Sequence, residues 1–255
     1  MLIDTHAHLT DEAFSGSVDE IISKAKDCTV TKIITSGFDY SSSVEAVKFA
    51  EKYQGVYASI GDYPENIYEY NEEIENKLET LAKHDKVVAI GEIGLQYTDG
   101  MPDREKQKEI FLKQVALANR CHLPIVIHCR DAYGDMIELL KKNKNLLSHG
   151  GTFHCFSGSY EIAREALKLG FYISVGGVST FKNATSLKET LKKLPLERLI
   201  LETDCPYLAP HPYRGKLNMP SFVPTIAANL AEIKGVSVEE IAEKTSQNAE
   251  KLFKF

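Results

Sequence analysis

The sequence predicts a (β/α)₈ barrel, the fold also called a TIM barrel, over its 255 residues. Short apolar runs rich in β-branched residues alternate with amphipathic segments at intervals of about 30 residues, the pattern of βαβ units and a parallel sheet. Eight such runs in a chain of this length favour a closed barrel over an open doubly wound sheet. We therefore expect a single barrel domain spanning residues 1–255.

The expected strands are short runs of apolar residues. Val87–Ile90 and Pro124–Ile127 are almost continuously apolar, as are strands that are buried on both faces. In chain order, the eight expected strands are Leu2–Ile3, Lys32–Ser36, Val56–Ile60, Val87–Ile90, Pro124–Ile127, Gly151–Phe153, Phe171–Val175 and Leu199–Leu201.

The segments between these runs have helical periodicity. In Ile110–Ala118 and in Ile162–Leu167, apolar residues recur at steps of three and four. Ser159 is placed to cap the second of these helices. The tail from Ser237 to Phe255 is expected to form a last helix that closes the barrel, with Ser237 and Glu240 spaced as a capping box.

Composition excludes several classes of protein. No run of about 18 apolar residues is present, so no membrane span is expected. The start of the chain lacks the basic and apolar segments of an export signal, and the five cysteines are scattered, which together indicate reduced thiols and a cytoplasmic protein. A formal charge of -6 argues against broad electrostatic binding of nucleic acid, although not against a local basic patch. A monomer is the default expectation.

Histidines and carboxylates recur where the expected strands end. His6 and His8 come directly after the first strand and, two residues apart in an extended segment, point to the same side. The carboxyl ends of barrel strands converge on one face, which is where active sites lie in this fold. Four histidines and two carboxylates follow five different strands in this way: His6, His8, Glu92, His128, His154 and Asp204.

Mixed imidazole and carboxylate ligands suit Zn²⁺, Mn²⁺ or iron, and also Mg²⁺ if water completes the shell. A single histidine of this kind is usually structural, Glu92 alone would suit a buried ion pair, and Asp204 alone would suit a turn or helix cap. As a set they predict a site for divalent metal ions, expected to be two in number, that activate water between them. In this scheme Asp204 and Glu92 are the catalytic residues, because Asp204 can accept a proton and Glu92 can bridge the ions. One ion would be bound by His6, His8 and Asp204, and the other by His128 and His154.

The motifs around these residues resemble those of the TatD deoxyribonucleases, a family of the amidohydrolase superfamily. The resemblance extends over the whole chain, and it implies a (β/α)₈ fold, dependence on divalent metal ions and hydrolysis of DNA. The six residues named above match the metal positions of that family. The segments that carry the resemblance are Asp4–His8, Gly91–Leu95, Ile127–Asp131, His154–Gly158, Gly176–Lys182, Glu202–Leu208, Pro212–Lys216, Asn218, Asn248–Ala249 and Leu252–Phe253.

Two positions depart from the family pattern. Tyr63 stands before Pro64 where the family usually has a histidine thought to help bind substrate phosphate. Gln96 follows Gly94-Leu95 where the family usually has an aspartate. Neither change removes an expected ligand. We expect activity to persist, with altered strength, metal affinity or substrate preference.

Cations near the expected mouth suggest an anion site. A phosphodiester substrate requires such a site even on an acidic protein. The expected substrate-binding residues are Arg130, Lys182, Arg214 and Lys216, each of which would otherwise be a solvated surface charge. Aromatic rings could stack on unpaired bases, as in many proteins that bind single strands, or simply pack in the barrel. The candidates are Tyr63, Tyr97, Phe156, Phe181 and Tyr207.

These expectations favour a metal-dependent deoxyribonuclease that acts on single-stranded DNA or 3′ ends, with DNA as its partner. A metal-dependent amidase, lactonase or esterase of the same superfamily is the main alternative, and it would have a tight neutral pocket in place of a basic rim. A protein that binds metal or nucleic acid without turnover is a further alternative, in view of Tyr63 and Gln96.

Overall fold

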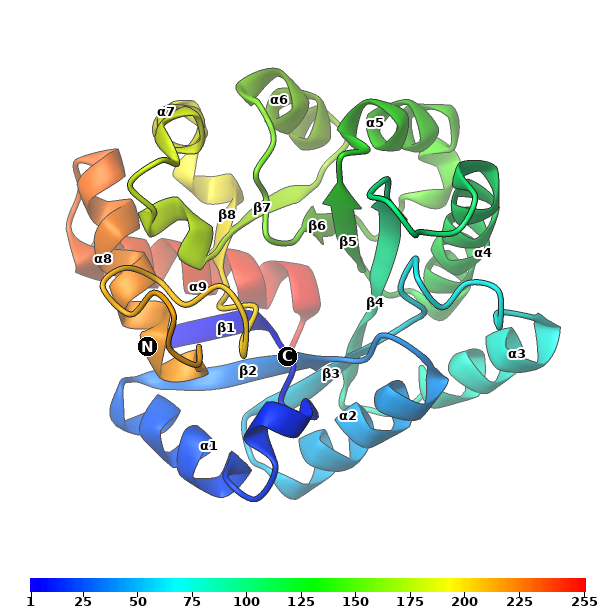
Figure 1. Cartoon of the computed structure of the whole chain (residues 1–255), viewed down its shortest axis with the longest axis horizontal. Helices are drawn as coiled ribbons and strands as arrows, with labels where there is room; N and C mark the ends of the chain where they lie inside the picture. Colours follow the sequence, from blue (N-terminus) through cyan, green and yellow to red (C-terminus); the bar gives the residue numbers. More distant parts are fainter.

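The computed structural model describes residues 1–255 and shows a closed parallel barrel (Figure 1). Its strands are hydrogen-bonded in chain order from β1 to β8. A parallel bridge between Ala7 and Cys205 and a hydrogen bond of 2.9 Å from Thr5 Oγ1 to the carbonyl of Leu201 join β1 to the β8 side. The predicted fold is therefore confirmed. The strands are β1 (Leu2–Ala7), β2 (Val30–Ser36), β3 (Val56–Ile60), β4 (Val87–Gln96), β5 (Ile125–Arg130), β6 (Gly151–Phe153), β7 (Tyr172–Val175) and β8 (Leu199–Leu201).

Helices surround the strands, as Figure 1 shows. None of them combines the length and apolar character that crossing a membrane would require. The nine α-helices are α1 (Val18–Asp27), α2 (Tyr40–Lys52), α3 (Glu72–Leu81), α4 (Arg104–Cys121), α5 (Tyr133–Lys142), α6 (Tyr160–Lys168), α7 (Thr185–Lys193), α8 (Val223–Lys234) and α9 (Val238–Phe253).

The predicted helix caps are largely confirmed. The Ser159 side chain accepts a hydrogen bond from the Ile162 backbone at the start of α6, and Ser237 accepts one from the Glu240 backbone at the start of α9. The Glu240 side chain is exposed to water and does not accept the return bond from the Ser237 backbone N–H. Only half of the predicted capping box is therefore present.

Three strands run further than their apolar cores indicate. β4 continues through Gln96 because its second half pairs with β5, with Gly94 opposite His128 and Gln96 opposite Arg130. Glu92 therefore lies inside β4, where we had expected it to follow the strand. His128 lies inside β5 and His6 inside β1 for the same reason. The polar residues of these strands face the barrel mouth, so they do not end the strands.

The amino-terminal end of the barrel is closed by α9. A cluster of ten buried apolar residues fills this end, and it combines strand residues such as Ile3 and Val126 with Leu252 and Phe253 of α9. In Figure 1, α9 (red) lies beside β1 and β8, which it contacts. Because this end is packed, the opposite end, where the carboxyl ends of the strands meet, is the one available for a site.

Candidate metal centre

The six predicted ligands gather at the carboxyl end of the barrel. A cavity of about 520 Å³ opens there, with five of them in its lining and the sixth, His6, fully buried beneath it. Strand alternation and the closure of the sheet bring together residues that are separated by up to 198 positions in the chain, from His6 to Asp204. The lining ligands are His8, Glu92, His128, His154 and Asp204.

Glu92 lies at the centre of the group, and its two carboxylate oxygens face different histidine pairs. Oε1 is 2.7 Å from His128 Nδ1 and 2.8 Å from His154 Nε2. Oε2 is 3.3 Å from His6 Nε2 and 3.6 Å from His8 Nε2. A carboxylate placed in this way can bind one ion through each oxygen, which is the bridging role expected of Glu92.

Asp204 completes the second half of the group. Its Oδ1 is 3.7 Å from His6 Nε2 and 3.5 Å from His8 Nε2. The two Nε2 atoms are 3.1 Å apart, as are His128 Nδ1 and His154 Nε2. Two ring nitrogens this close cannot both carry a proton that points at the other, so each pair presents at least one lone pair. Converging lone pairs and carboxylate oxygens fit divalent metal ions.

The first histidine pair is oriented by β2. The Ser36 hydroxyl lies 3.1 Å from His6 Nδ1 and 2.8 Å from the Ser59 hydroxyl of β3. His8 Nδ1 is 3.3 Å from the Ser36 carbonyl oxygen, which can only accept, so this nitrogen carries the proton. The Nε2 atom of His8 is then free to bind a metal ion. Hydrogen bonds of this kind commonly fix the tautomer of metal-binding histidines.

Two buried acids beside the cluster were not assigned a role from the sequence. Glu202 Oε1 lies 3.8 Å from His154 Nδ1 and accepts a hydrogen bond from the Cys155 backbone. Asp4 accepts hydrogen bonds from the Thr203 backbone and hydroxyl, at 2.9 and 2.6 Å. Both acids directly follow apolar strand residues, and a charged residue at such a position was the signal available in the sequence.

Burial and mutual contacts shift the pKa values of the residues in this cluster. Burial, the charge of His154 and the neighbouring His8 lower the pKa of His6 to about 4, although its contact with Glu92 opposes this. Burial alone would lower the pKa of His154, but the charge of Glu92, its hydrogen bond and the charges of Glu202 and Asp204 together outweigh burial and raise this pKa to about 10. Burial acts against ionisation of Glu92 and Asp204, yet the facing imidazoles keep both pKa values below the usual range. Both carboxylates are therefore ionised at neutral pH.

Asp204 also occupies an uncommon backbone conformation. Its φ angle is 58°, in the left-handed region, which aspartate adopts more readily than most residues. Its backbone N–H donates to the His6 carbonyl at 2.9 Å. This bond fixes the chain after β8 against β1 and brings the Asp204 carboxylate next to the first histidine pair.

Of the predicted substrate-binding cations, only Arg130 lines the cavity. Lys182, Arg214 and Lys216 lie outside its lining, and the Arg214 guanidinium stacks 3.9 Å from the ring centre of Phe181. These three residues belong to loops after β7 and β8, whose course could not be read from strand spacing. The expected basic rim around the cavity is thus reduced to one arginine.

Of the aromatic residues that were expected to stack on bases, some line the cavity and others do not. Tyr63 and Tyr207 line the cavity, whereas Tyr97, Phe156 and Phe181 do not. Phe38 lines it as well and was missed, because a single exposed phenylalanine in the loop after β2 gives no pattern. The exposed fractions of Phe38 and Tyr207 are 40% and 55%, and their ring centres lie 6.4 and 6.2 Å from that of His8.

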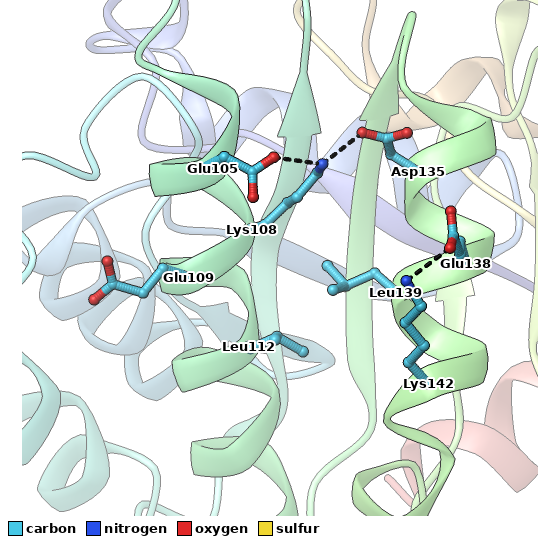
Figure 2. Close-up of a pocket in the computed structure, with 8 residues that line it drawn as sticks. All are labelled: Glu105, Lys108, Glu109, Leu112, Asp135, Glu138, Leu139 and Lys142. Carbon is cyan, nitrogen blue, oxygen red and sulfur yellow. Dashed lines mark hydrogen bonds and ion pairs between the residues drawn. The ribbon is translucent and has the colours of Figure 1, made fainter.

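A second hollow of about 370 Å³ lies between α4 and α5 (Figure 2). Lys108 bridges Glu105 and Asp135 across it, and Lys142 pairs with Glu138. The remaining acid, Glu109, pairs with Lys106 and Lys113, and no metal-binding cluster lies there. The chemistry of the molecule is therefore concentrated in the barrel mouth.

The chain is similar to known proteins along its whole length. The model of the family described as TatD related DNase matches residues 3–254. The uncharacterized metal-dependent hydrolase YabD of Bacillus subtilis (strain 168) is 46% identical over 254 residues, which cover 100% of this chain and 99% of that protein. The 3'-5' ssDNA/RNA exonuclease TatD of Klebsiella pneumoniae (strain 342) is 32% identical, with 99% and 97% covered. The crystal structure of YJJV, a TatD homolog from Escherichia coli, matches with a TM-score of 0.94, at 32% identity and with 100% and 98% covered.

Proposed function

Because the chain belongs to the family of TatD related DNases, a family of metal-dependent hydrolases, we propose that it is a nuclease that removes nucleotides from the ends of single-stranded DNA. The observation that carries this proposal is the Glu92 carboxylate, which faces one histidine pair with each oxygen. That arrangement suits two divalent ions, and Mn²⁺, Mg²⁺ and Zn²⁺ are the candidates.

The residues divide into two ligand sets that share Glu92. His6, His8 and Asp204 would bind one ion, and His128 and His154 would bind the other. Glu92 Oε2 lies nearest the first histidine pair and Oε1 nearest the second. When bound, such ions lower the pKa of water and neutralise charge on phosphate oxygens.

The protein's own side chains supply the remaining functions. Asp204 is kept ionised by the facing histidines, so its carboxylate can accept a proton from the attacking water. Arg130 lines the same cavity and can donate hydrogen bonds to a phosphate oxygen, which both orients the ester and offsets its charge. Hydrolysis then breaks the bond between phosphorus and the leaving sugar oxygen, which takes up a proton.

The shape and charge of the cavity support a terminal nucleotide as substrate. A volume of about 520 Å³ is within the range of sites for small ligands. Asp11 and Glu65 also line the cavity, so a long phosphate backbone would meet acids as well as Arg130. Phe38 and Tyr207 offer exposed rings on which an unpaired base can stack. Relatives from Klebsiella pneumoniae and Pantoea vagans bear the name 3'-5' ssDNA/RNA exonuclease, which agrees with this proposal.

Hydrolysis of a 5′-end-labelled single-stranded oligonucleotide tests the proposal. With Mn²⁺ we expect a ladder that shortens one nucleotide at a time from the 3′ end, and a much slower reaction on blunt duplex DNA. A protein with both His128→Ala and His154→Ala serves as the control and should give no ladder. Internal cuts without a ladder would contradict end-directed action, and equal cleavage by the control would contradict the assigned site.

An amidase or esterase is the second candidate, and the scarcity of cations in the cavity favours it. A site lined by one arginine can also accept a neutral substrate. The same metal-loaded protein should therefore be assayed on neutral amides, esters and lactones. Faster turnover of any of these than of the oligonucleotide, lost in the double histidine variant, would select this candidate.

A further inference from the structure

Tyr63 and Gln96, which depart separately from the family pattern, form a single unit in the structure. Tyr63 lies in the loop after β3, and Gln96 is the last residue of β4. The Tyr63 hydroxyl donates to Gln96 Oε1 at 2.5 Å. Both groups also contact the same ring nitrogen, His128 Nε2, at 3.1 Å from the hydroxyl and 2.8 Å from Oε1.

The orientation of the Gln96 amide is set by its surroundings. Its Nε2 donates to the Thr98 hydroxyl at 3.0 Å, which leaves Oε1 to face His128. The Gln96 backbone is held on both sides by the buried Gln107 side chain, which accepts from the Gln96 N–H and donates to its carbonyl, each at 2.8 Å. Gln96 therefore presents an amide oxygen at a fixed position.

An amide oxygen can only accept hydrogen bonds, so the proton between it and His128 belongs to Nε2 of the imidazole. The other ring nitrogen, Nδ1, faces the metal centre, 2.7 Å from Glu92 Oε1 and 3.1 Å from His154 Nε2. The Glu92 carboxylate can also only accept, so without metal a proton lies between Nδ1 and Oε1. A metal ion that binds His128 would displace that proton from Nδ1, because Nε2 keeps the proton that it donates to Gln96.

We propose that Gln96 and Tyr63 are positioning residues, which together hold the proton of His128 on Nε2 and so make Nδ1 the nitrogen that binds metal. The inference rests on the proposed metal site and is independent of the substrate. The Tyr63 hydroxyl occupies the remaining lone pair of Oε1 and so prevents the amide from turning away. Because both residues are uncharged, they orient the ligand without adding negative charge to it, and metal affinity at His128 should be sensitive to the charge at position 96.

The tautomer can be observed directly by nitrogen NMR of the Zn²⁺-loaded protein labelled with ¹⁵N-histidine. We expect the His128 signals of a proton on Nε2 and of a metal-bound Nδ1. Gln96→Leu removes the acceptor and should give a mixture of tautomers, whereas Gln96→Glu retains an acceptor and should retain the single tautomer. Tyr63→Phe should also give a mixture of His128 tautomers, but to a smaller extent than Gln96→Leu. Its matched control is Tyr133→Phe, since that hydroxyl bonds to Ser157 away from the metal centre.

Titration with Zn²⁺ against a competing chelator gives a second readout that does not depend on turnover. Gln96→Leu should weaken the affinity about 10–100-fold, and Gln96→Glu should restore or exceed the wild-type affinity. A wild-type His128 with its proton on Nδ1 would overturn the proposal, as would an unchanged tautomer and affinity in Gln96→Leu. If Gln96→Leu fails to fold, the wild-type spectrum and the Tyr63→Phe variant still test the proposal. A correct tautomer in a protein without nuclease activity would count against the proposed substrate alone.

Discussion

Glu92 is the only side chain of the metal centre that contacts all four histidines. Glu92→Gln keeps its shape but replaces one oxygen by an amide nitrogen, which cannot bind a cation. We expect at least about a 100-fold fall in kcat together with weaker binding of metal. Steady-state kinetics and metal analysis measure both, beside Glu138→Gln on the surface of α5, which should behave as wild type. A Glu92→Gln protein that retains two tightly bound ions would contradict the bridging role.

Asp62 provides a pH-dependent test away from the ligands. Burial, reinforced by the charges of Asp39 and Glu69, raises its pKa from 3.8 to about 7. Its contribution to stability is then fully present below pH 3.8 and is lost as the pH rises through 7. Relative to Asp62→Asn, the wild-type protein should lose up to about 4 kcal/mol of unfolding free energy between pH 4 and 8, at about 1.4 kcal/mol per pKa unit. Denaturant unfolding at each pH measures this, and equal pH profiles would refute it.

The clustering of the six candidate ligands could be predicted from the sequence because each one stands at a fixed place relative to a recognisable strand. The residues that orient them could not. Ser36 acts on His6 across 30 positions, and Glu202 lies beside His154 across 48. Such partners depend on the register between strands, which an isolated sequence does not specify. The link between Tyr63 and Gln96 was hidden for the same reason.

At the scale of elements, the close approach of β4 and β5 determines where His128 lies. A Cβ atom at Gly94 would collide with the His128 carbonyl on the neighbouring strand. Gly94→Ala should therefore cost about 1–3 kcal/mol of stability and displace a ligand, with a loss of metal affinity. Gly134→Ala is the matched control, since a Cβ there meets nothing within 4 Å, and it should be neutral or slightly stabilising. Thermal denaturation compares them, and an equally stable Gly94→Ala protein would contradict the packing argument.

Apolar runs predicted every strand but not where the strands end. In β4 the residues after Ile90 include Glu92 and Gln96, and such polar residues usually mark a loop. They continue the strand here because the barrel mouth provides hydrogen-bonding partners for them. The course of the loops after β7 and β8 could not be predicted from strand spacing either, and Lys182 and Arg214, which were expected at the mouth, lie outside the cavity lining.

At the scale of the molecule, metal binding should be coupled to stability. Ions that bind the folded barrel and not the unfolded chain stabilise the fold by mass action. The stabilisation is about 2.7 kcal/mol when the free metal concentration is 100 times the dissociation constant. Removal of metal by EDTA should therefore lower Tm, and Mn²⁺ should restore it. Glu92→Gln should show little of this shift. A Tm that is insensitive to metal in the wild-type protein would contradict a tight site at the barrel mouth.

In the proposed mechanism, two ions joined by Glu92 form one hydrolytic centre. The most direct test of this mechanism titrates Mn²⁺ into metal-free protein and follows, in the same samples, bound metal and release of nucleotides from single-stranded DNA. We predict that the rate rises steeply and saturates at about two equivalents of bound ion per chain. Full activity at one equivalent, or without any bound ion, would contradict the claim.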